Sequence, residues 1–293
     1  MVKSSISTPI AQPDEDFDLS SSDGYPIYVS YFKSSVPDSN KVTLIGGGAG
    51  LVQYRYYKFA RYLSEQGYHV YTFDYRGMGK SKRRSLKNES INLSDWAEKD
   101  MASLIDSIQK QWPSADYYFV GHCMSCHLLP LIEQNGLFKK IAFVATAWGA
   151  WNQYPNKYWI GLHVQTWVPL ITELVGYLPS SMFQGAEDLP KGVVREWRKW
   201  FNHPDMSKPY TKSIRYIESI TCPVRLFYCP YDTIAPYPLV KLFGKQLTNA
   251  KVDFKNLDEL WQKDKSQVKH HGFFKEKFNV LWHCIPEFFR FKI

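Results

Sequence analysis

The sequence alternates short apolar runs with longer stretches in which apolar residues recur three or four positions apart. Apolar runs of this length are typical of strands buried on both faces, and the second pattern is typical of helices. The runs predict strands over 42–45, 69–74, 117–120, 139–146, 222–229 and 251–257. The intervening pattern predicts helices over 54–66, 92–112 and 238–247. This alternation predicts an α/β fold whose mostly parallel sheet is covered by helices on both faces.

Two segments depart from the alternation. Residues 17–32 predict a hairpin closed by an Asp-Gly turn at Asp23 and Gly24. Residues 148–217 show no clear strand, and their many aromatic residues favour helices, with a bend at Pro169. We therefore expect a core formed by residues 1–147 and 218–293, and an inserted helical lid formed by residues 148–217.

The residues after the strand at 117–120 carry the most specific chemical signal. They read Gly121-His122-Cys123-Met124-Ser125, which predicts a sharp turn from a strand into a helix with Cys123 at its apex. Such a turn is usually written G-x-S-x-G, and small residues flank it because the strand and the helix pack closely. Here a cysteine replaces the serine and a serine replaces the second glycine. Cys123 is therefore the candidate nucleophile.

A nucleophile of this kind needs a base that takes its proton and an acid that orients the base. In this arrangement the chain order is nucleophile, acid, base. Asp232 follows the strand at 222–229, and His270 lies in the loop after the strand at 251–257. Both are expected at the carboxyl edge of the sheet, where ligands bind in open α/β folds.

Several neighbouring residues remain alternatives. His271 adjoins His270 and could be the base, while Asp253 and Asp258 are alternative acids. His122 sits beside the nucleophile, but at this position of the turn its side chain should point away from the site and pack in the core.

The glycine-rich run 46–50 follows the first buried strand. It lacks the Gly-Lys-Ser/Thr ending of a phosphate-binding loop and does not match G-x-G-x-x-G. Close approach of its backbone to an acyl oxyanion explains it better, so the expected oxyanion donors are the N–H groups of Gly48 and Met124. Gly47 and Ala49 are expected to contact the substrate.

Tryptophans of the inserted segment are candidates for the wall of an apolar substrate pocket. Most aromatic residues of such an insertion form its own small core, so only a few need to face a ligand. The candidates are Trp148, Trp151, Trp159 and Trp167.

Cys123 and Cys126 also form a Cys-x-x-Cys pattern, which is typical of thiol redox proteins. Such proteins place it after the first strand of a shorter fold, whereas several βα units precede it here. A metal site with His122 and His127 is disfavoured because one face of the turn cannot present all four side chains. We expect neither a metal nor another cofactor.

The composition argues against a membrane protein, a disulfide-rich protein and a secreted protein. With 44% hydrophobic residues the chain can bury a large core, yet it has no run of about 18 uncharged apolar residues, so stable membrane insertion is not expected. The odd number of five cysteines does not suggest a disulfide framework, and the polar, acidic N-terminus does not read as a signal peptide. We therefore expect a cytoplasmic protein.

The net charge of +8 is spread along the chain. The one basic cluster, formed by Lys80, Lys82, Arg83 and Arg84, reads as a solvated loop, with a landing site for an anion as the alternative. No motif typical of nucleic-acid binding is present, so nucleic acid is not an expected partner.

Several segments together resemble a family of bacterial predicted α/β-hydrolases with no single assigned reaction. They begin at Arg55 (RYYKFA), Tyr71 (YTFDYRGMGKS), Leu93 (LSDW), Gly121 (GHCMS), Glu187 (EDLP) and His270 (HHGFF). The resemblance covers nearly all of the chain beyond its first twenty or so residues. It implies an eight-stranded α/β-hydrolase core with an inserted lid and a triad on Cys123, Asp232 and His270.

The cysteine at the turn departs from the usual hydrolase pattern. Dienelactone hydrolases and polyhydroxyalkanoate synthases also carry a cysteine there, so the departure is compatible with catalysis. We expect a small-molecule acyl substrate and a hydrolase of esters, lactones or thioesters that acts through an acyl-enzyme. An acyltransferase on the same triad and a non-catalytic binding protein are the alternatives. The oligomeric state stays open, with a homodimer among the options.

Overall fold

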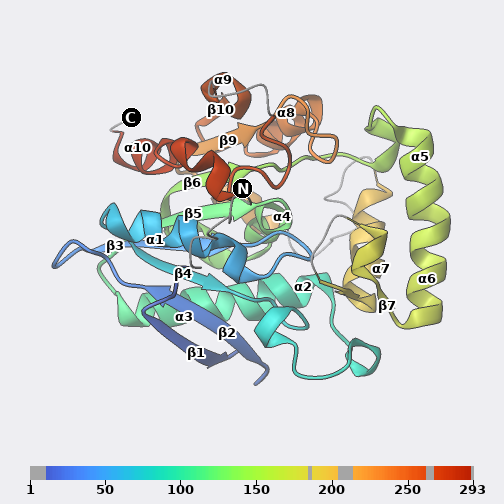
Figure 1. Ribbon diagram of the computed structural model, residues 1–293, viewed down its shortest axis with the longest axis horizontal. Helices are drawn as coiled ribbons and strands as arrows, with labels where there is room; N and C mark the ends of the chain where they lie inside the picture. The colour runs from blue at the N-terminus through green and yellow to red at the C-terminus, as the bar shows by residue number, and fades with distance from the viewer. Residues whose placement is uncertain (1–10, 184–186, 204–213, 262–266, 292–293) are drawn as a thin grey trace, which may run out of the picture.

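The computed structural model describes residues 11–183, 187–203, 214–261 and 267–291. Its centre is an eight-stranded sheet in the order β1-β2-β4-β3-β5-β6-β9-β10 (Figure 1). The strands are β1 Glu15–Ser20, β2 Pro26–Phe32, β3 Lys41–Gly46, β4 His69–Phe73, β5 Asp116–His122, β6 Phe138–Val144, β9 Val224–Tyr228 and β10 Val252–Asn256.

The sheet is mostly parallel, as the apolar runs predict. All neighbouring strands from β4 to β10 pair in parallel, whereas β1 pairs antiparallel with β2 and β2 antiparallel with β4. The predicted hairpin is β1–β2, and Gly24 in its turn has a φ of 83°, which favours glycine. The parallel order brings the carboxyl ends of β3, β5 and β9 to one edge, where the candidate residues follow.

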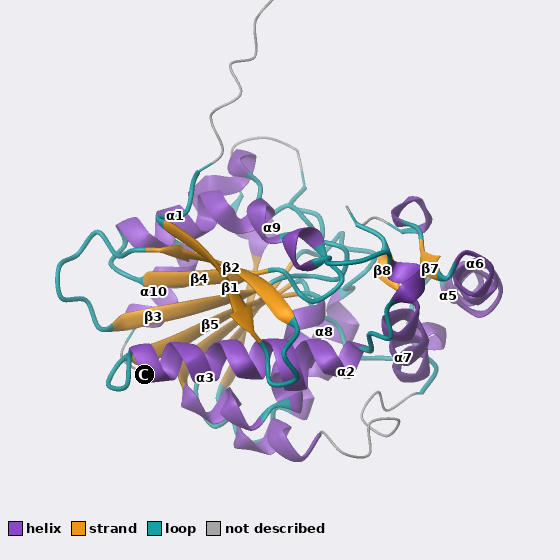
Figure 2. Ribbon diagram, turned by 90° about the horizontal axis from the view of Figure 1, so that it is seen from below, coloured by secondary structure: helices purple, strands orange, loops and turns teal. Residues whose placement is uncertain are grey.

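Helices cover both faces of the sheet. Helices α1 (Tyr57–Glu65) and α10 (Cys284–Arg290) pack on one face, and α3 (Ala102–Gln111) and α8 (Tyr237–Gln246) on the other. Figure 2 shows α1 and α3 on opposite sides of the strands. Buried side chains of β5 alternate accordingly, because successive residues of a strand point to opposite faces. The sequence prediction of an α/β fold with a parallel sheet covered on both faces is therefore confirmed.

The helix predicted over 92–112 is divided into three parts. A single turn, α2 (Leu93–Asp95), leads into a π-helical segment, Trp96–Met101, and then into α3. At its start the Asn92 N–H donates to the Asp95 carboxylate at 2.7 Å, which satisfies one of the backbone donors that a helix leaves free.

The segment from 148 to 217 is largely helical where it is described. It contains α5 (Lys157–Leu162), a π-helical segment (His163–Trp167), α6 (Val168–Val175) and α7 (Lys191–Phe201). The sequence did not predict two short strands between α6 and α7. These strands, β7 (Tyr177–Leu178) and β8 (Leu189–Pro190), pair antiparallel with each other. In both ribbon views α5 and α6 lie at the outer edge of the molecule, with α7 inside them (Figures 1 and 2).

Pro169 lies just after the π-helical segment, and Trp167 and Val168 before it keep right-handed helical dihedrals, so the helical path continues through the proline.

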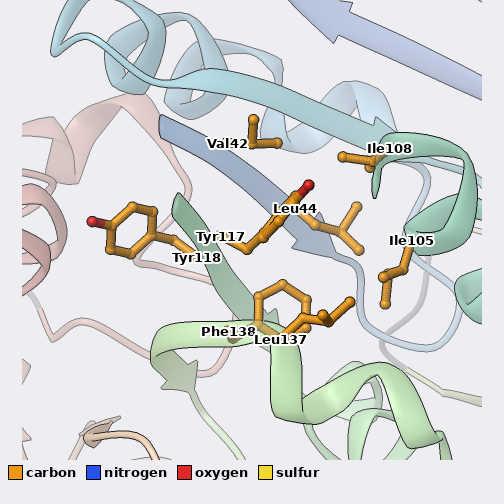
Figure 3. A pocket seen from close by; sticks show the side chains of 8 residues that line it. All are labelled: Val42, Leu44, Ile105, Ile108, Tyr117, Tyr118, Leu137 and Phe138. Atoms are coloured by element: carbon orange, nitrogen blue, oxygen red, sulfur yellow. The ribbon is translucent and has the colours of Figure 1, made fainter. Parts of the chain in front are cut away.

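The core between β3, β5 and α3 is closely packed. A void of about 10 Å³ remains there (Figure 3). Its walls are apolar and include Leu44, Ile105 and Phe138. An apolar space of this size is too small for a ligand, so this end of the sheet is structural.

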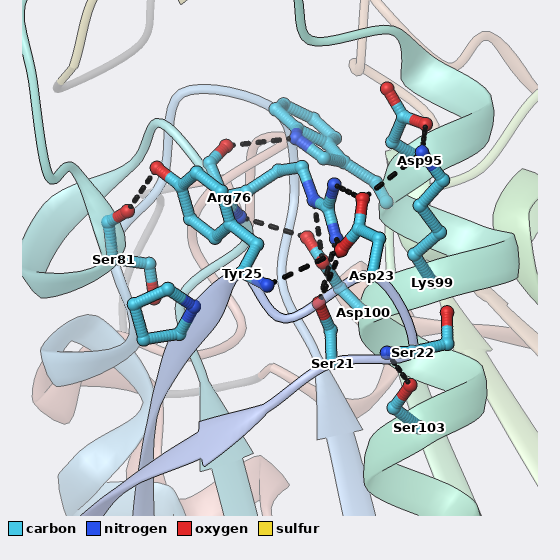
Figure 4. A network of polar contacts seen from close by, with 12 residues as sticks. Ser21, Ser22, Asp23, Tyr25, Arg76, Ser81, Asp95, Lys99, Asp100 and Ser103 are labelled. Atoms are coloured by element: carbon cyan, nitrogen blue, oxygen red, sulfur yellow. Dashed lines mark hydrogen bonds and ion pairs between the residues drawn. The ribbon is translucent and has the colours of Figure 1, made fainter.

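A buried arginine joins the hairpin to the helical layer. Arg76, in the loop after β4, donates from Nε to Asp100 at 2.7 Å and from its backbone N–H to the same carboxylate at 2.8 Å. It also donates to Asp23 at 2.8 Å and to Ser21 at 2.9 Å (Figure 4). These hydrogen bonds hold the pKa of Asp23 well below its usual range.

Trp96 completes this network, because its indole N–H donates to the Arg76 carbonyl at 3.0 Å. Arg76 and Asp100 are both almost fully buried. The loop that leaves β4 is therefore fixed by one charged side chain with several partners.

We expect Asp100→Ala to destabilise the protein, because it leaves the Arg76 charge buried without its main partner. Breaking a buried pair in this way costs roughly 3–5 kcal/mol. Urea unfolding followed by circular dichroism measures the difference. The matched control is Asp253→Ala, which removes an exposed partner of Arg225 and should cost less than about 1 kcal/mol. Equal losses in the two variants would contradict the role given to Arg76.

Candidate active site

The turn at Cys123 has the strained geometry that the sequence predicts. Strand β5 ends at His122, and helix α4 (Met124–Leu128) begins directly after Cys123. Cys123 itself has φ 52° and ψ −108°, a conformation that non-glycine residues rarely adopt. Its side chain is partly exposed, whereas that of Cys126 in the same turn is fully buried. The turn thus presents one thiol at the carboxyl edge of the sheet.

Glycines at the base of the turn make its close packing possible. A Cβ atom on Gly121 would lie 2.8 Å from Phe119 and 3.0 Å from Phe143. A Cβ on Gly46, in the neighbouring strand β3, would lie 2.6 Å from the Cβ of Ser125. Strand and helix therefore approach so closely that larger residues would push them apart.

Ser125, which replaces the second glycine of the pattern, adds hydrogen bonds across this contact. Its Oγ donates to the carbonyl oxygen of Gly46 at 2.8 Å and accepts from the N–H of His122 at 2.8 Å. The side chain is fully buried. The serine therefore ties the turn to β3, and Gly46 supplies the room that it needs.

The predicted base and acid form a buried pair. The Nδ1 atom of His270 lies 2.7 Å from Oδ2 of Asp232, and both side chains are about 95% buried or more. The other carboxylate oxygen accepts the N–H groups of Ile234 and Ala235 at 2.8 and 2.9 Å. Burial alone would raise the pKa of Asp232, but these hydrogen bonds and the charge of His270 lower it. The carboxylate is thus held ionised and orients the imidazole.

His270 also interacts with Cys123. Because Nδ1 faces Asp232, the Nε2 atom is left for the thiol. Burial would lower the pKa of His270, but the charge of a Cys123 thiolate, the hydrogen bonds with Asp232 and Cys123 and the charge of Asp232 outweigh it and raise the pKa. The arrangement therefore favours the protonated form of His270.

His271, the alternative base, is placed differently. Neither of its ring nitrogens has a hydrogen-bond partner in the described part of the chain. Burial, followed by the charge of His270, lowers its pKa to about 4. Asp232 therefore pairs with His270 and not with His271.

The alternative acids are engaged elsewhere. Asp253 forms an exposed ion pair with Arg225 at 2.7 Å, across β9 and β10. Asp258 accepts the N–H of Val268 at 2.7 Å, which helps to fix the loop that leads to His270.

A hydrogen-bonded chain that the sequence analysis missed runs beneath the site. The Gly48 N–H donates to Tyr56 Oη at 3.0 Å, and Tyr56 Oη lies 2.8 Å from Nδ1 of His122. The Nε2 atom of His122 lies 3.1 Å from the carbonyl oxygen of His270. Since a carbonyl only accepts, Nε2 carries the proton and Nδ1 accepts from the tyrosine.

Burial keeps His122 neutral, because it lowers the pKa of the imidazole well below the usual value. Its side chain lies under the His270 loop and packs on Phe274, with ring centroids 5.0 Å apart. The expected packing role is thus combined with a bridge between the glycine-rich loop and the His270 loop. A tyrosine at the start of a helix gave no sequence signal of this contact.

The glycine-rich loop lies against Cys123. A Cβ on Gly48 would be 3.4 Å from the Cβ of Cys123, and one on Gly47 would be 3.3 Å from the ring of Tyr56. Met124 is the first residue of α4, so its N–H has no acceptor within the helix. The Gly48 N–H is engaged by Tyr56, which leaves Ala49 as the next donor along the loop.

The four candidate tryptophans are not gathered at one wall. Trp148 is buried and stacks on His127 with ring centroids 6.0 Å apart, and Trp151 packs against Gly161 of α5. In contrast, Trp159 is 74% exposed and Trp167 is 49% exposed. The expectation that these last two line the pocket is not supported, because the helix turns its small face inward and its large side chains outward.

Tyr154 is an aromatic residue close to the site that the sequence analysis did not single out. It is buried, and burial together with the charges of Cys123 and Asp232 raises its pKa. Its ring packs against Phe201 of α7 with centroids 5.3 Å apart. The segment from 148 to 217 therefore has a buried tyrosine near enough to Cys123 for their charges to interact.

A cleft opens beside Asp232 and His270. It has a volume of about 720 Å³ and is lined by three loops together with Phe278. The lining residues are Pro155, Asn156, Pro230, Tyr231, Asp232, Thr233, Ile234, Pro236, Gln267, Lys269, His270, His271, Gly272 and Lys275.

The three histidines near the turn could be considered as metal ligands, because ring nitrogens of His122, His270 and His271 lie within 4.8 Å of one another. Both nitrogens of His122 and Nδ1 of His270 are already hydrogen-bonded. The cluster is therefore better explained as a hydrogen-bonded network than as a metal site.

No helix among the described residues has the length and apolarity needed to cross a membrane.

Solved structures with the same fold cover nearly the whole chain. Est1E from Butyrivibrio proteoclasticus with bound ferulic acid has a TM-score of 0.59 at 16% identity, over 91% of this chain and 95% of that one. A thermostable carboxyl esterase from Bacillus coagulans in complex with glycerol has 0.60 at 15%, over 94% and 97%. The thioesterase domain from the curacin biosynthetic pathway has 0.57 at 16%, over 93% and 99%.

The search of curated proteins gave no match. The model of the Hydrolase_4 family, described as serine aminopeptidase S33, matches residues 37–197, which is more than half of the chain. With this match, the eight-stranded sheet and the similar solved structures, the resemblance inferred from the sequence is confirmed at the level of the fold and the family. The chain belongs to the Hydrolase_4 family and is an α/β-hydrolase.

Proposed function

We propose that the protein hydrolyses small acyl esters or thioesters through a covalent intermediate on Cys123. The observation that carries this proposal is the strained turn that presents Cys123 beside the buried pair of His270 and Asp232. A thiol, a base and an orienting acid in this arrangement are the parts that acyl transfer requires.

In the proposed reaction, the thiolate of Cys123 attacks the acyl carbonyl carbon and forms a tetrahedral oxyanion. His270 then gives its proton to the leaving alcohol or thiol as the bond to the carbonyl carbon breaks, which leaves a thioester on Cys123. Water attacks this thioester, His270 takes the proton of the water, and the carboxylic acid leaves as the thiolate is restored. Asp232 keeps the imidazole in the orientation that both proton transfers need.

The oxyanion would be stabilised by backbone N–H groups at the turn. Met124 supplies one donor, as the start of α4 implies. The second donor would come from Gly48, which would exchange its bond to Tyr56 for the oxyanion, or from Ala49 beside it. Gly47 and Ala49 would contact the substrate from the same loop.

The segment from 148 to 217 would act as a lid on the core formed by 1–147 and 218–293. Trp148 and Trp151 are its candidates for contact with the acyl group, together with Tyr154. Titles of similar solved structures name esterases and a thioesterase domain, which fits ester or thioester substrates.

Acyl transfer to an acceptor other than water is the second candidate. It is favoured by the cysteine at the turn, because a thioester passes its acyl group to thiols and amines more readily than an oxygen ester does. If Cys123 were inert, the remaining alternative would be a binding protein without catalytic activity. The cytoplasmic location expected from the sequence stays a prediction.

The proposed function is tested by intact-mass measurement after incubation with a panel of acyl thioesters and activated esters. We expect a mass increase equal to one acyl group in the wild type and none in Cys123→Ala. Turnover without any adduct in rapid-quench samples, or an adduct on both proteins, would contradict a Cys123 acyl-enzyme. Release of free acid distinguishes hydrolysis from transfer to an added thiol.

We expect iodoacetamide to label Cys123 much faster than the other cysteines at about pH 7. Burial raises the pKa of Cys222 to about 12 and also raises the pKa of Cys126, Cys229 and Cys284, so these thiols stay protonated and slow. Peptide mass spectrometry at short times measures each site. Labelling of Cys123 at the rate of Cys222 would remove it as the nucleophile.

We expect His270→Ala to lose about 10³-fold or more in kcat/KM, since the general base and acid is gone. His271→Ala should retain most activity. Its pKa of about 4 lies below the assay range, so His271 is neutral from about pH 5 upward, and the pH profile of His271→Ala should keep its wild-type shape. An inactive His271→Ala beside an active His270→Ala would reverse the assignment.

A further inference from the structure

The cleft beside His270 has the size and the position of a binding site for the part of the substrate that leaves. Its volume of about 720 Å³ lies in the range of small-molecule sites. Asp232 and His270 line it, but Cys123 does not. In a reaction of the proposed kind, the histidine protonates the leaving group and later deprotonates the acceptor. The leaving group and the acceptor must therefore both contact His270, which is one of the residues that line the cleft.

The charges around this cleft are predominantly positive. Lys269 and Lys275 line it with exposed side chains, and no carboxylate in the described part of the chain pairs with either. Arg55 lies close enough to help lower the pKa of His271, as does Lys275. A ligand in the cleft therefore meets two free ammonium groups and a third cation nearby.

The described residues that line the cleft carry little negative charge. Among the described lining residues Asp232 is the one carboxylate, and its oxygens are taken by His270 and by the N–H groups of Ile234 and Ala235. Glu276, next to Lys275 in sequence, forms an ion pair with Lys58 instead. Asn156, Thr233 and Gln267 add uncharged polar groups to the walls.

We propose that this cleft binds the leaving group or acceptor of the acyl transfer, and that it selects one that carries a carboxylate or phosphate a few bonds from the reacting sulfur or oxygen. The inference rests on the proposed function, because it assigns the histidine side of the same site. Lys269 and Lys275 act on the ligand by charge and take no part in bond making. The anionic group is held at the cleft while His270 transfers its proton to the sulfur or oxygen.

The test uses butyryl thioesters that share one acyl group and differ in the charge of the thiol. The thiols are 3-mercaptopropionate (anionic), N-acetylcysteamine (neutral) and thiocholine (cationic), and 2-mercaptoethyl phosphate separates phosphate from carboxylate. Each kcat/KM, measured by thiol release, is divided by the rate of the same thioester in hydroxide, which removes differences in intrinsic reactivity. We expect the anionic thioesters to exceed the cationic one by about tenfold at low salt, and the difference to shrink as salt is added.

Matched variants locate the effect. Lys269→Gln combined with Lys275→Gln should lower the ratio of anionic to cationic kcat/KM by about fivefold or more. Lys110→Gln removes the same charge near the end of α3, just before β5 and thus at the opposite edge of the sheet, and should leave all four values unchanged. An unchanged ratio in the double variant, or a flat charge series in the wild type, would overturn the inference.

The outcome separates the two proposals. Turnover of the neutral thioester with no preference for charge overturns the anionic cleft and leaves the acyl hydrolase standing. No turnover of any thioester together with no acyl adduct on Cys123 overturns both.

Discussion

The backbone strain at Cys123 is the constraint on which the rest of the site depends. A non-glycine residue held at positive φ costs on the order of 1–3 kcal/mol and persists only where its surroundings prevent relaxation. Here Gly46 and Gly121 let β3, β5 and α4 approach until no space is left, and Ser125 adds hydrogen bonds across the contact. The parallel sheet thus supplies the packing that holds the thiol at its edge.

The proposed base, His270, is held by a second buried network. Asp232 is hydrogen-bonded to the His270 ring, and His122 is hydrogen-bonded to the backbone carbonyl of His270. Tyr56 then connects His122 to the N–H of Gly48 in the glycine-rich loop. All the groups of this chain are buried and paired, and buried networks of this kind are costly to distort. The loop expected to bind the oxyanion and the loop that carries the base therefore keep a fixed separation.

The cysteine distinguishes this chain from the family pattern in a physical sense. The charge of a cysteine side chain, which serine would not supply, is the largest of the effects that raise the pKa of His270. The segment from 148 to 217 differs from a simple apolar cover, because Tyr154 is buried near Cys123 while Trp159 and Trp167 are exposed. The sequence analysis had placed Trp159 and Trp167 at the substrate and had not singled out Tyr154.

The sequence by itself determined the features that are written in neighbouring residues. Apolar runs located the strands of the parallel sheet, the Asp-Gly turn located the hairpin, and the small residues around Cys123 located the strained turn. The sequence also placed Cys123, Asp232 and His270 each after a predicted parallel strand, and such strands bring their carboxyl ends to one edge. The observed helix boundaries differ from the predicted ones where a π-helical segment interrupts the helix, as at Trp96–Met101.

Only the tertiary structure decided which of two adjacent histidines meets Asp232, because neighbours in a loop point in different directions and neither direction is encoded locally. It also decided the bridge from Tyr56 to His122 and on to the His270 loop, which joins residues 66 and 148 positions apart. The outward rotation of Trp159 likewise depends on which face of α5 packs inward. Contacts of this kind arise when distant segments are brought together by burial of the core, so no local pattern carries them.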